Sequence, residues 1–379
     1  MAIDNKDKKI LNVPHLRFPE FTEEWEETTL GKISEITKGS GISKDQLSEQ
    51  GSPCILYGEL YTKYKSEIID EVYSRTELDS SSLVKSKAND VIIPCSGETA
   101  IDISTARCVP FNNILLGGDL NIIRLKHDDG GFFAYQLNGA RKKDIARVAQ
   151  GVSVVHLYGE NLKHIRVYHP AIEEQKKITR LLSLIDERIA TQNKIIEKLQ
   201  SLIKGLAAQL TQSGTPNIRL CDCLECHSST LLENCVSVTG SYPVYGATGL
   251  IGYTNNYAYN GESILIVKDG SGVGSLSYVN DHFSVIGTLN YLTAKENYSI
   301  LYLYYALMAF NFTPYITGMA IPHIYFKDYG KAKLFYPSIE KRIRIASLLH
   351  NIEQKLVVEQ NLVISLSTQK SYLLRMLFI

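Results

Sequence analysis

The chain has 379 residues, of which 44% are hydrophobic and 21% are charged, so it is long enough for two or three globular domains. Residues 1–30 lack the apolar core of a signal peptide, and the two long uncharged runs, 234–261 and 297–326, are interrupted by proline and polar residues, so neither is expected to span a membrane. We therefore expect a cytoplasmic protein with no membrane partner. Lysine plus arginine and aspartate plus glutamate each number 40, so the basic excess typical of an autonomous nucleic-acid binder is missing.

Residues 1–171 are predicted to form a mixed domain of short strands and helices. The run Asp90–Pro94 has the composition of a buried strand, and a helix is expected near Leu30. The densest basic cluster, Arg141-Lys142-Lys143, lies in a further predicted helix. This cluster is either a solvated helix face or a set of phosphate contacts, and the sequence leaves both interpretations open.

Residues 172–213 predict a long helix, because Pro170 precedes a run of early carboxylates and no further proline or glycine occurs before Gly205. Apolar residues recur along this helix in alternating steps of four and three, which is the spacing of a coiled-coil seam. The seam begins with Ile178, Leu182, Ile185, Ile189, Gln192 and Ile196.

Residues 214–337 predict a second mixed domain. Strands are expected at Ser263–Val267 and Leu276–Val279, on either side of a glycine-rich loop. A nucleotide-binding loop would need a helix after it, whereas this loop leads into a strand. The loop is therefore either a plain tight turn or a turn that presents polar side chains to DNA. Those side chains are Lys268, Ser271 and Ser275.

Residues 338–379 predict a second long helix with the same seam. The seam begins with Ile345, Leu349, Ile352, Leu356 and Glu359, and it continues through a second polar position, Lys370, to Leu377. Two seams imply one pair of helices, and an antiparallel pair is the simplest arrangement because the chain must return. We expect the polar residues Gln192 and Glu359 to fix the register of this pair. On the helices alone, a coiled-coil scaffold or adaptor that does not bind DNA remains the alternative function.

An internal repeat relates the two halves of the chain. The segment Gly151–Tyr158 and the later Pro170 return 167 positions further on as Gly318–Tyr325 and Pro337. Upstream matches pair Leu30 with Leu220, Tyr57 with Tyr245 and Gly118 with Gly287. One unit, a mixed domain followed by a long helix, therefore occurs twice.

The cysteines near the start of the second copy suggest a zinc site only weakly. The repeat aligns Cys223 and Cys226 with Ile33 and Ile36, two apolar positions expected on one face of a helix that starts near Leu220 in this copy. We therefore predict small hydrophobic side chains here and no metal, with zinc as the alternative.

The duplicated order resembles the specificity subunit of type I restriction-modification enzymes. The motifs that carry the resemblance are Trp25-Glu-Glu-Thr-Thr-Leu-Gly31, Pro170-Ala-Ile-Glu-Glu-Gln175 and Tyr242-Pro-Val-Tyr-Gly-Ala247. The resemblance covers nearly the whole chain and implies an α+β fold. In this fold, two pseudo-two-fold-related mixed α/β target-recognition domains are separated by two long antiparallel coiled-coil helices.

The resemblance also implies a function. Each domain would read one half of a bipartite double-stranded DNA target, and the helices would set the gap and dock two methyltransferase subunits, joined by two endonuclease subunits. The chain itself would be non-catalytic, with S-adenosylmethionine bound by the methyltransferase and ATP and magnesium by the endonuclease. In agreement, the sequence has no G-x-x-x-x-G-K-[ST] loop and no Asn-Pro-Pro-Tyr-like motif.

The predicted DNA contacts are polar, basic and tyrosine side chains in loops at related places of the two copies, together with the basic cluster. In the first copy they are Lys38, Ser40, Tyr57, Ser96, Thr99, Arg141, Lys142, Lys143, Ser153, His156 and Tyr158. In the second copy they are Tyr242, Tyr245, Lys268, Ser271, Ser275, Thr317, His323 and Tyr325. The paired histidines either contact DNA or pack structurally, and the sequence does not decide between these roles.

Overall fold

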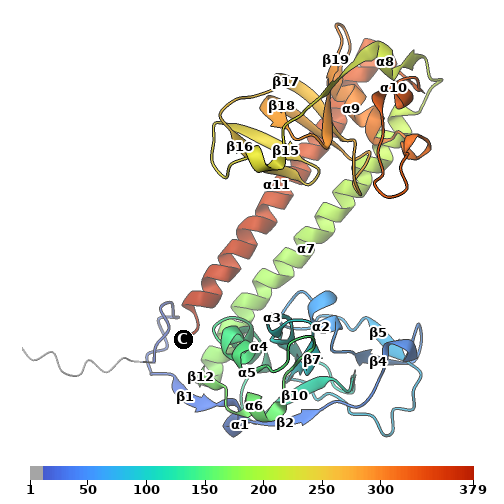
Figure 1. Cartoon of the computed structure of the whole chain (residues 1–379). Helices are drawn as coiled ribbons and strands as arrows, with labels where there is room; N and C mark the ends of the chain where they lie inside the picture. Colours follow the sequence, from blue (N-terminus) through green and yellow to red (C-terminus); the bar gives the residue numbers. More distant parts are fainter. Residues whose placement is uncertain (1–11) are drawn as a thin grey trace, which may run out of the picture. The chain divides into compact units, whose positions relative to one another are not determined.

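The computed structural model describes residues 12–379, which form two compact units (Figure 1). Unit 1 contains the described residues up to Gln192 together with Leu362–Ile379, and unit 2 contains Asn193–Asn361. Each unit thus combines one mixed domain with parts of both long helices, whereas the sequence predicts each helix as a separate segment between or after the domains. Residues 1–11, which enter the argument against a signal peptide, lie outside the described residues. Within residues 12–379, no helix is long and apolar enough to cross a membrane.

Among its described residues, unit 1 contains two four-stranded sheets and two short ribbons. The first sheet has the order β2 (Ser34–Lys38), β10 (Leu120–Leu125), β6 (Asp90–Pro94) and β8 (Arg107–Val109). The second has the order β3 (Leu47–Ser48), β5 (Ser74–Thr76), β4 (Ser52–Ile55) and β9 (Leu115–Leu116). The ribbons pair β1 (Glu26–Thr29) with β12 (Arg166–His169), and β7 (Ser96–Gly97) with β11 (Val155–His156). The helices of this domain are α1 (Leu30–Ile33), α2 (Glu59–Thr62), α3 (Ala100–Ile103), α4 (Gly130–Asn138), α5 (Lys142–Val148) and α6 (Gly159–Lys163).

Unit 2 is built around a six-stranded sheet. Its order is β14 (Leu224–Ser228), β19 (Leu289–Ala294), β17 (Tyr259–Val267), β18 (Leu276–Val285), β15 (Tyr242–Gly246) and β16 (Gly249–Thr254). A ribbon pairs β13 (Ile218–Arg219) with β20 (Lys333–Leu334). The helices of the domain are α8 (Leu220–Cys223), α9 (Ile300–Met308) and α10 (Phe326–Tyr329). The two long helices, shared by the units, are α7 (Ile172–Thr211) and α11 (Ile339–Met376).

The helices α4 and α9 are the apolar centres of their domains. Nearly every residue of each is buried, so both elements are hydrophobic all round rather than on one stripe. Their first turns are closed by capping side chains, because Asp129 accepts a hydrogen bond from the N–H of Phe132 and Ser299 accepts one from the N–H of Tyr302. The caps satisfy N–H groups that would otherwise be buried without partners.

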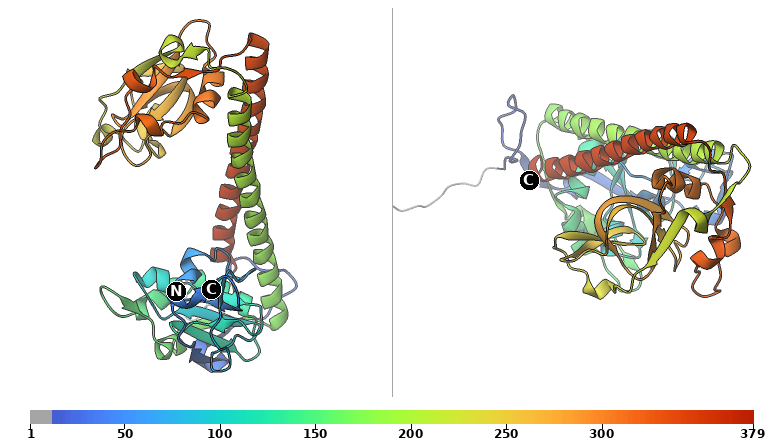
Figure 2. Two further views of the ribbon diagram at one scale, coloured as in Figure 1. Left: turned by 90° about the vertical axis from the view of Figure 1, so that its right-hand side faces the viewer. Right: turned by 90° about the horizontal axis from the view of Figure 1, so that it is seen from above.

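The helices α7 and α11 are antiparallel, because each unit contains the start of one and the end of the other (Figure 2). In unit 1, Ile178 and Leu182 of α7 share a hydrophobic core with Phe378, which follows the end of α11. In unit 2, Ile203 of α7 shares a core with Leu349 of α11. The predicted α+β class with long antiparallel helices is therefore confirmed.

All predicted seam positions are at least partly buried. Buried positions are Ile178, Leu182, Gln192, Ile345, Leu349 and Glu359, and half-buried positions are Ile185, Ile189, Ile196, Ile352 and Leu356. The carboxylate of Glu359 forms an ion pair with Lys355, whereas the side-chain oxygen of Gln192 has no hydrogen-bond partner among the described residues. A buried polar group without a partner costs stability, which is what a register-fixing residue is expected to do.

Strand pairing confirms the repeat. Lys38 lies opposite Asn121 in unit 1, and Ser228 lies opposite Asn290 at the matching place in unit 2. The same holds at the base of each domain, where Thr29 faces Arg166 and Arg219 faces Lys333.

One match made from the sequence is wrong by two residues. In the parallel pair of β4 and β9, Ile55 lies opposite Leu116, and in the parallel pair of β15 and β18, Tyr245 lies opposite Val285. Leu116 and Val285 are equivalent in the repeat, so Tyr245 corresponds to Ile55 and not to Tyr57. The Tyr-Gly pair occurs by coincidence beside loops of different length.

The expected helices near Leu30 and Leu220 are single turns that lead directly into β2 and β14. Cys226 therefore lies in a strand and does not share a helical face with Cys223, contrary to the prediction. Burial raises the pKa of Cys223 to about 12, as expected for a thiol that packs as a small hydrophobic side chain. Residues 12–379 contain no group of His, Cys, Asp and Glu side chains that could hold a metal ion.

Candidate nucleic-acid interface

In unit 1, two of the predicted loops lie side by side as a strand pair. Ser96 of β7 lies opposite His156 of β11. The N–H of Leu157 donates to the carbonyl oxygen of Cys95 at 2.7 Å, which extends the pairing by one more hydrogen bond. Loops that are far apart in sequence therefore form one surface strip.

We call the segments 150–158 and 317–325, which contain His156 and His323, the histidine loops. In unit 2, the glycine-rich loop lies beside the second histidine loop, as Ser96 lies beside the first. Asp269 lies opposite His323, and the N–H of Gly270 donates to the carbonyl oxygen of Pro322 at 2.9 Å. Asp269 and Ser96 are thus at equivalent positions. Each domain builds its surface strip from the same two segments, although the side chains differ.

A histidine ring and a tyrosine ring lie next to each other in each strip. The rings of His156 and Tyr158 are stacked, with 6.2 Å between centroids, and those of His323 and Tyr325 meet edge to face at 5.0 Å. The ammonium of Lys327 lies 5.0 Å from the centroid of Tyr325. Both tyrosines are about half exposed, at 46% and 47%, so they offer flat, polar-tipped surfaces.

The glycine-rich loop is a tight turn between β17 and β18, as the sequence predicts. Gly270 and Gly274 have φ angles of 99° and 86°, a region that favours glycine. Ser271 and Ser275 are exposed on this turn, whereas Lys268 is half-buried and its ammonium lies 4.0 Å from the neighbouring Asp269 carboxylate. The chain leaves the turn as a strand, so no helix end is present there to hold a phosphate.

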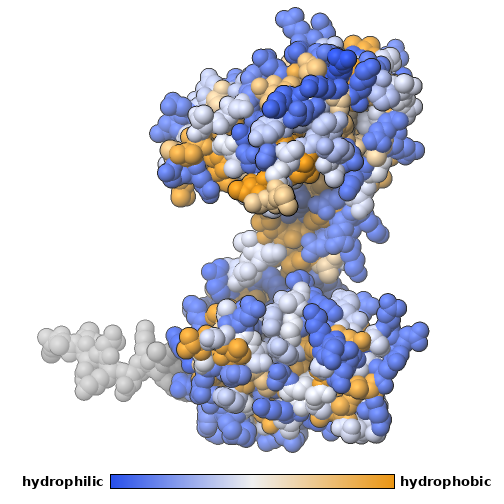
Figure 3. All heavy atoms as spheres, turned by 45° about the vertical axis from the view of Figure 1, so that its right-hand side comes forward, coloured by the Kyte–Doolittle hydropathy of each residue, from blue (hydrophilic) through white to orange (hydrophobic). Residues whose placement is uncertain are grey.

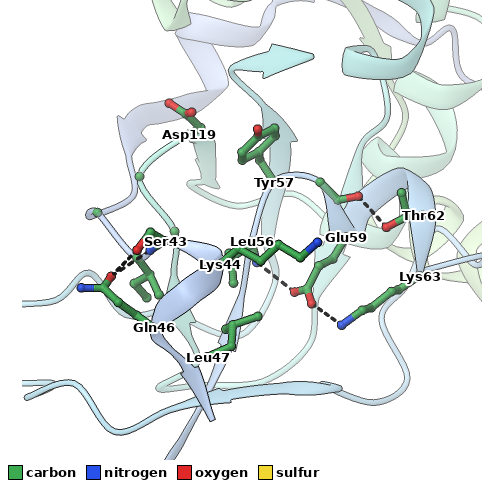
Figure 4. Close-up of a pocket in the computed structure, with 15 residues that line it drawn as sticks. Ser43, Lys44, Gln46, Leu47, Leu56, Tyr57, Glu59, Thr62, Lys63 and Asp119 are labelled. Carbon is green, nitrogen blue, oxygen red and sulfur yellow. Dashed lines mark hydrogen bonds and ion pairs between the residues drawn. The ribbon is translucent and has the colours of Figure 1, made fainter. Parts of the chain in front are cut away.

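A pocket of about 830 Å³ lies in unit 1 (Figure 4). The side chains of Tyr57, Lys44 and Asp119 line it. The carboxylate of Asp119 also accepts a hydrogen bond from the hydroxyl of Ser96 at 3.2 Å, so the pocket adjoins the strip. Tyr57 was predicted from the sequence to contact DNA, and the structure places it on this pocket.

Sequence reasoning missed Asp119 and its counterpart Thr288. Each is the exposed residue just before the central strand β10 or β19. Their carbonyl oxygens accept hydrogen bonds from equivalent N–H groups, of Cys95 at 2.7 Å and of Lys268 at 3.0 Å. A signal was available, because the matched segments after Gly118 and Gly287 differ at these positions while the following residues agree.

The basic cluster of α5 does not form one exposed set. The guanidinium of Arg141 donates to the carbonyl oxygen of Ile379, pairs with Asp144 at 3.2 Å and lies 5.4 Å from the centroid of Tyr168. Burial, with the charge of Arg107, lowers the pKa of Lys142. Of the three predicted phosphate contacts, Lys143 is the one classed as exposed.

Two further predicted contacts have local structural partners. The hydroxyl of Ser40 accepts a hydrogen bond from the N–H of Val84 at 2.8 Å, and that of Thr99 caps α3 by accepting from the N–H of Asp102 at 3.1 Å. Lys38, at the end of β2, is exposed.

The predicted tyrosines of β15 are half-buried in ring clusters. The ring of Tyr242 lies 4.9 Å from that of Tyr257 and 5.6 Å from that of His282, and Tyr245 packs on Phe283 at 6.4 Å. Ser153 and Thr317, in contrast, are exposed on the two histidine loops.

A tyrosine–carboxylate hydrogen bond joins each domain to a long helix, and sequence reasoning missed it. The hydroxyl of Tyr135 on α4 donates to Asp186 on α7 at 2.7 Å, and that of Tyr305 on α9 donates to Glu353 on α11 at the same distance. In unit 1, Lys370 also pairs with Asp186 at 2.6 Å, which explains this charged position in the seam. Burial nevertheless raises the pKa of Asp186 to about 6.

Comparison with known proteins places this fold in a family. The model of the type I restriction modification DNA specificity domain matches residues 22–201 and again 218–366, so each match contains one mixed domain and most of the helix that follows it. The specificity subunit of the M. genitalium type I system has the same fold, with a TM-score of 0.71, 18% identity and coverage of 97% of this chain and 99% of that one. A second structure, described as complex assembly and conformational transition of the type I R-M system, has a TM-score of 0.53 and 15% identity, and covers 92% and 96%.

Curated relatives match shorter stretches. The specificity subunit of the Escherichia coli type I enzyme EcoprrI is 28% identical over 112 residues, which are 30% of this chain and 28% of that protein. The specificity subunit of the Methanocaldococcus jannaschii enzyme MjaVIII is 24% identical over 213 residues, 55% of this chain and 46% of that protein. The matched stretches thus span less than half the length of these relatives. Because the family model matches most of the chain in two copies, the protein belongs to the type I restriction-modification DNA specificity family.

Proposed function

We propose that this chain is the DNA specificity subunit of a type I restriction-modification complex and that each mixed domain reads one half of a bipartite duplex target. The observation that carries the proposal is the pair of equivalent surface strips. They share one backbone arrangement, with Ser96 opposite His156 and Asp269 opposite His323. Loops on a rigid sheet are where binding side chains are commonly placed.

The side chains of the two strips support two different half-sites. Unit 1 offers the exposed carboxylate of Asp119, to which the buried hydroxyl of Ser96 donates. At the equivalent positions, unit 2 has the hydroxyl of Thr288 and the carboxylate of Asp269. Carboxylates accept hydrogen bonds from cytosine or adenine amino groups, and hydroxyls tolerate donors and acceptors. The exchange of these groups predicts an asymmetric target.

The long helices are proposed to set the gap and to dock two methyltransferase subunits, which two endonuclease subunits join. Hydrophobic surface on the helices supports a docking role (Figure 3). The exposed apolar residues of α11 are Ile339, Ile343, Leu348, Val357, Val358, Ile364 and Tyr372. The chain would act in the cytoplasm and carry out no chemistry itself, with S-adenosylmethionine bound by the methyltransferase and ATP and magnesium by the endonuclease.

The proposal is tested by expressing the chain with its methyltransferase partner in cells and mapping methylated adenines by single-molecule sequencing. We expect one bipartite motif with two unlike halves and a constant gap. Lys268→Ala in unit 2 should alter methylation through one half only, and Lys143→Ala in unit 1, at a position not related to Lys268 by the repeat, should act only through the other half. The proposal is contradicted if no methylated adenines appear. It is also contradicted if the same adenines are methylated when this chain is omitted, because the chain would then not supply the specificity.

A further inference from the structure

Each histidine loop ends in a narrow hairpin whose base is held by two backbone hydrogen bonds. Gln150 and His156 exchange N–H to carbonyl bonds of 2.9 and 2.7 Å, and Thr317 and His323 exchange bonds of 2.9 and 2.8 Å. The first residue of each apex is a glycine with positive φ, Gly151 at 120° and Gly318 at 90°. A Cβ there would lie 2.1 and 2.3 Å from a carbonyl oxygen across the apex, so both apices need glycine.

The apices carry hydrophobic side chains that touch little of the protein. Val152 is 97% exposed and Val154 is 53% exposed in unit 1, and the equivalent Met319 and Ile321 are 106% and 65% exposed in unit 2. A single exposed apolar residue needs no explanation, but the same two positions are exposed and apolar in both copies although their residues differ. Packing within the domain does not account for this.

The place and size of the apices favour duplex DNA as their partner. The hairpins extend directly from the strips that we propose read base edges, since His156 pairs with Ser96 and Pro322 bonds to Gly270. The surface of two side chains on a hairpin is far smaller than the roughly 800 Å² that each partner buries in a stable protein interface. They are enough for a wedge, because proteins kink duplex DNA by inserting one or two apolar side chains between base pairs.

We propose that the apices are wedges, Val152 with Val154 in one domain and Met319 with Ile321 in the other, which insert into the base stack of each half-site and kink it. The inference rests on the proposed function, because it requires that the mixed domains bind duplex DNA. Unstacking is least costly at pyrimidine–purine steps. Each half-site should therefore contain or adjoin such a step.

The test uses the assembled methyltransferase complex and its mapped target, with 2-aminopurine placed at successive steps of both half-sites. The methylated adenine itself is avoided, because its extrusion by the methyltransferase would also raise fluorescence. The wild-type complex should raise fluorescence at one step of each half-site. The double variant Val152→Ser, Val154→Ser should abolish the signal in one half-site and weaken binding roughly tenfold, equivalent to about 1.4 kcal/mol. Met319→Ser, Ile321→Ser is the matched variant for the other half-site.

Binding to a target with a mismatch at the wedged step distinguishes apical side chains that insert into the base stack from side chains that only stabilise the loops. The mismatch removes part of the unstacking cost, so it should tighten binding of the wild-type complex and of Val152→Leu, and tighten the serine variants much less. The proposal is overturned if the serine variants keep the fluorescence signal, or if they lose the methyltransferase subunits on gel filtration, which would make the apices protein-docking residues. A wild-type complex that binds no duplex at all would instead refute the proposed function.

Discussion

Among single residues, the exposed carboxylate of Asp119 is predicted to accept a hydrogen bond from one base edge of the proposed target. It lines the pocket beside Tyr57 and accepts a hydrogen bond from Ser96. Because a carboxylate only accepts hydrogen bonds, Asp119→Asn should reduce discrimination at one base pair of one half-site by about 1–3 kcal/mol. Competition binding of the methyltransferase complex to targets varied one base pair at a time measures this. Thr288→Val is the control, and its effect should fall in the other half-site.

A half-buried ion pair predicts how the stability of unit 1 depends on pH. The Nδ1 atom of His169 lies 3.0 Å from the carboxylate of Asp128, and this hydrogen bond raises the pKa of His169 against the opposing effect of burial. A raised histidine pKa means that the stabilisation is complete below the unfolded value of 6.5 and is lost as pH rises through the folded value. The free energy of unfolding of wild type relative to His169→Gln should therefore fall by about 1 kcal/mol as pH rises from 6 to about 9. Denaturant titrations of both proteins measure it, and a difference that is constant with pH would contradict the assignment.

At the scale of elements, the polar seam residues Gln192 and Glu359 are predicted to fix the register of α7 and α11. Replacing both with leucine should leave the free energy of unfolding equal or raise it by about 1–4 kcal/mol, because two buried polar groups are removed. It should also let the helices slide. Spin labels at the exposed Leu202 and Leu348, both in unit 2, would then give a broader distance distribution than in wild type. If the distance distribution in the double variant stays as narrow as in wild type, Gln192 and Glu359 do not fix the register. Ile352→Leu is the control, because it changes an apolar seam residue to another apolar residue.

At the scale of the whole molecule, charge balance predicts weak DNA binding by the chain alone. Residues 1–171 hold 21 basic and 24 acidic side chains, and residues 214–337 hold 6 and 8, so neither domain attracts phosphate through net charge. The isolated chain should bind nonspecific duplex with a Kd above roughly 10⁻⁵ M at physiological salt and with a shallow salt slope. Fluorescence anisotropy across salt concentrations tests this, with the methyltransferase complex as the comparison. Tight binding with a steep salt slope would show that the partners do not hold the duplex.

The sequence alone predicts the duplicated organisation and the long helices. Both are local or periodic features: the alternating four and three spacing from Ile178 and the return of Gly151–Tyr158 at Gly318–Tyr325 can be read without knowing any contact. It also predicted β6 and the strand after the glycine-rich loop. It failed at Leu30 and Leu220, where tertiary pairing ends each helix after one turn, and at Tyr57, where loop lengths differ between the copies.

Which groups meet and which remain exposed depends on contacts between distant parts of the chain. Ser96 and His156 are 60 positions apart in the chain, and sheet pairing alone makes them neighbours. Arg141 looked like a phosphate contact, but its guanidinium is held by Ile379, 238 residues away. Asp119 became a candidate contact because its side chain lines the pocket and accepts a hydrogen bond from Ser96. Burial and hydrogen bonding depend on such distant partners, so no local pattern could reveal them.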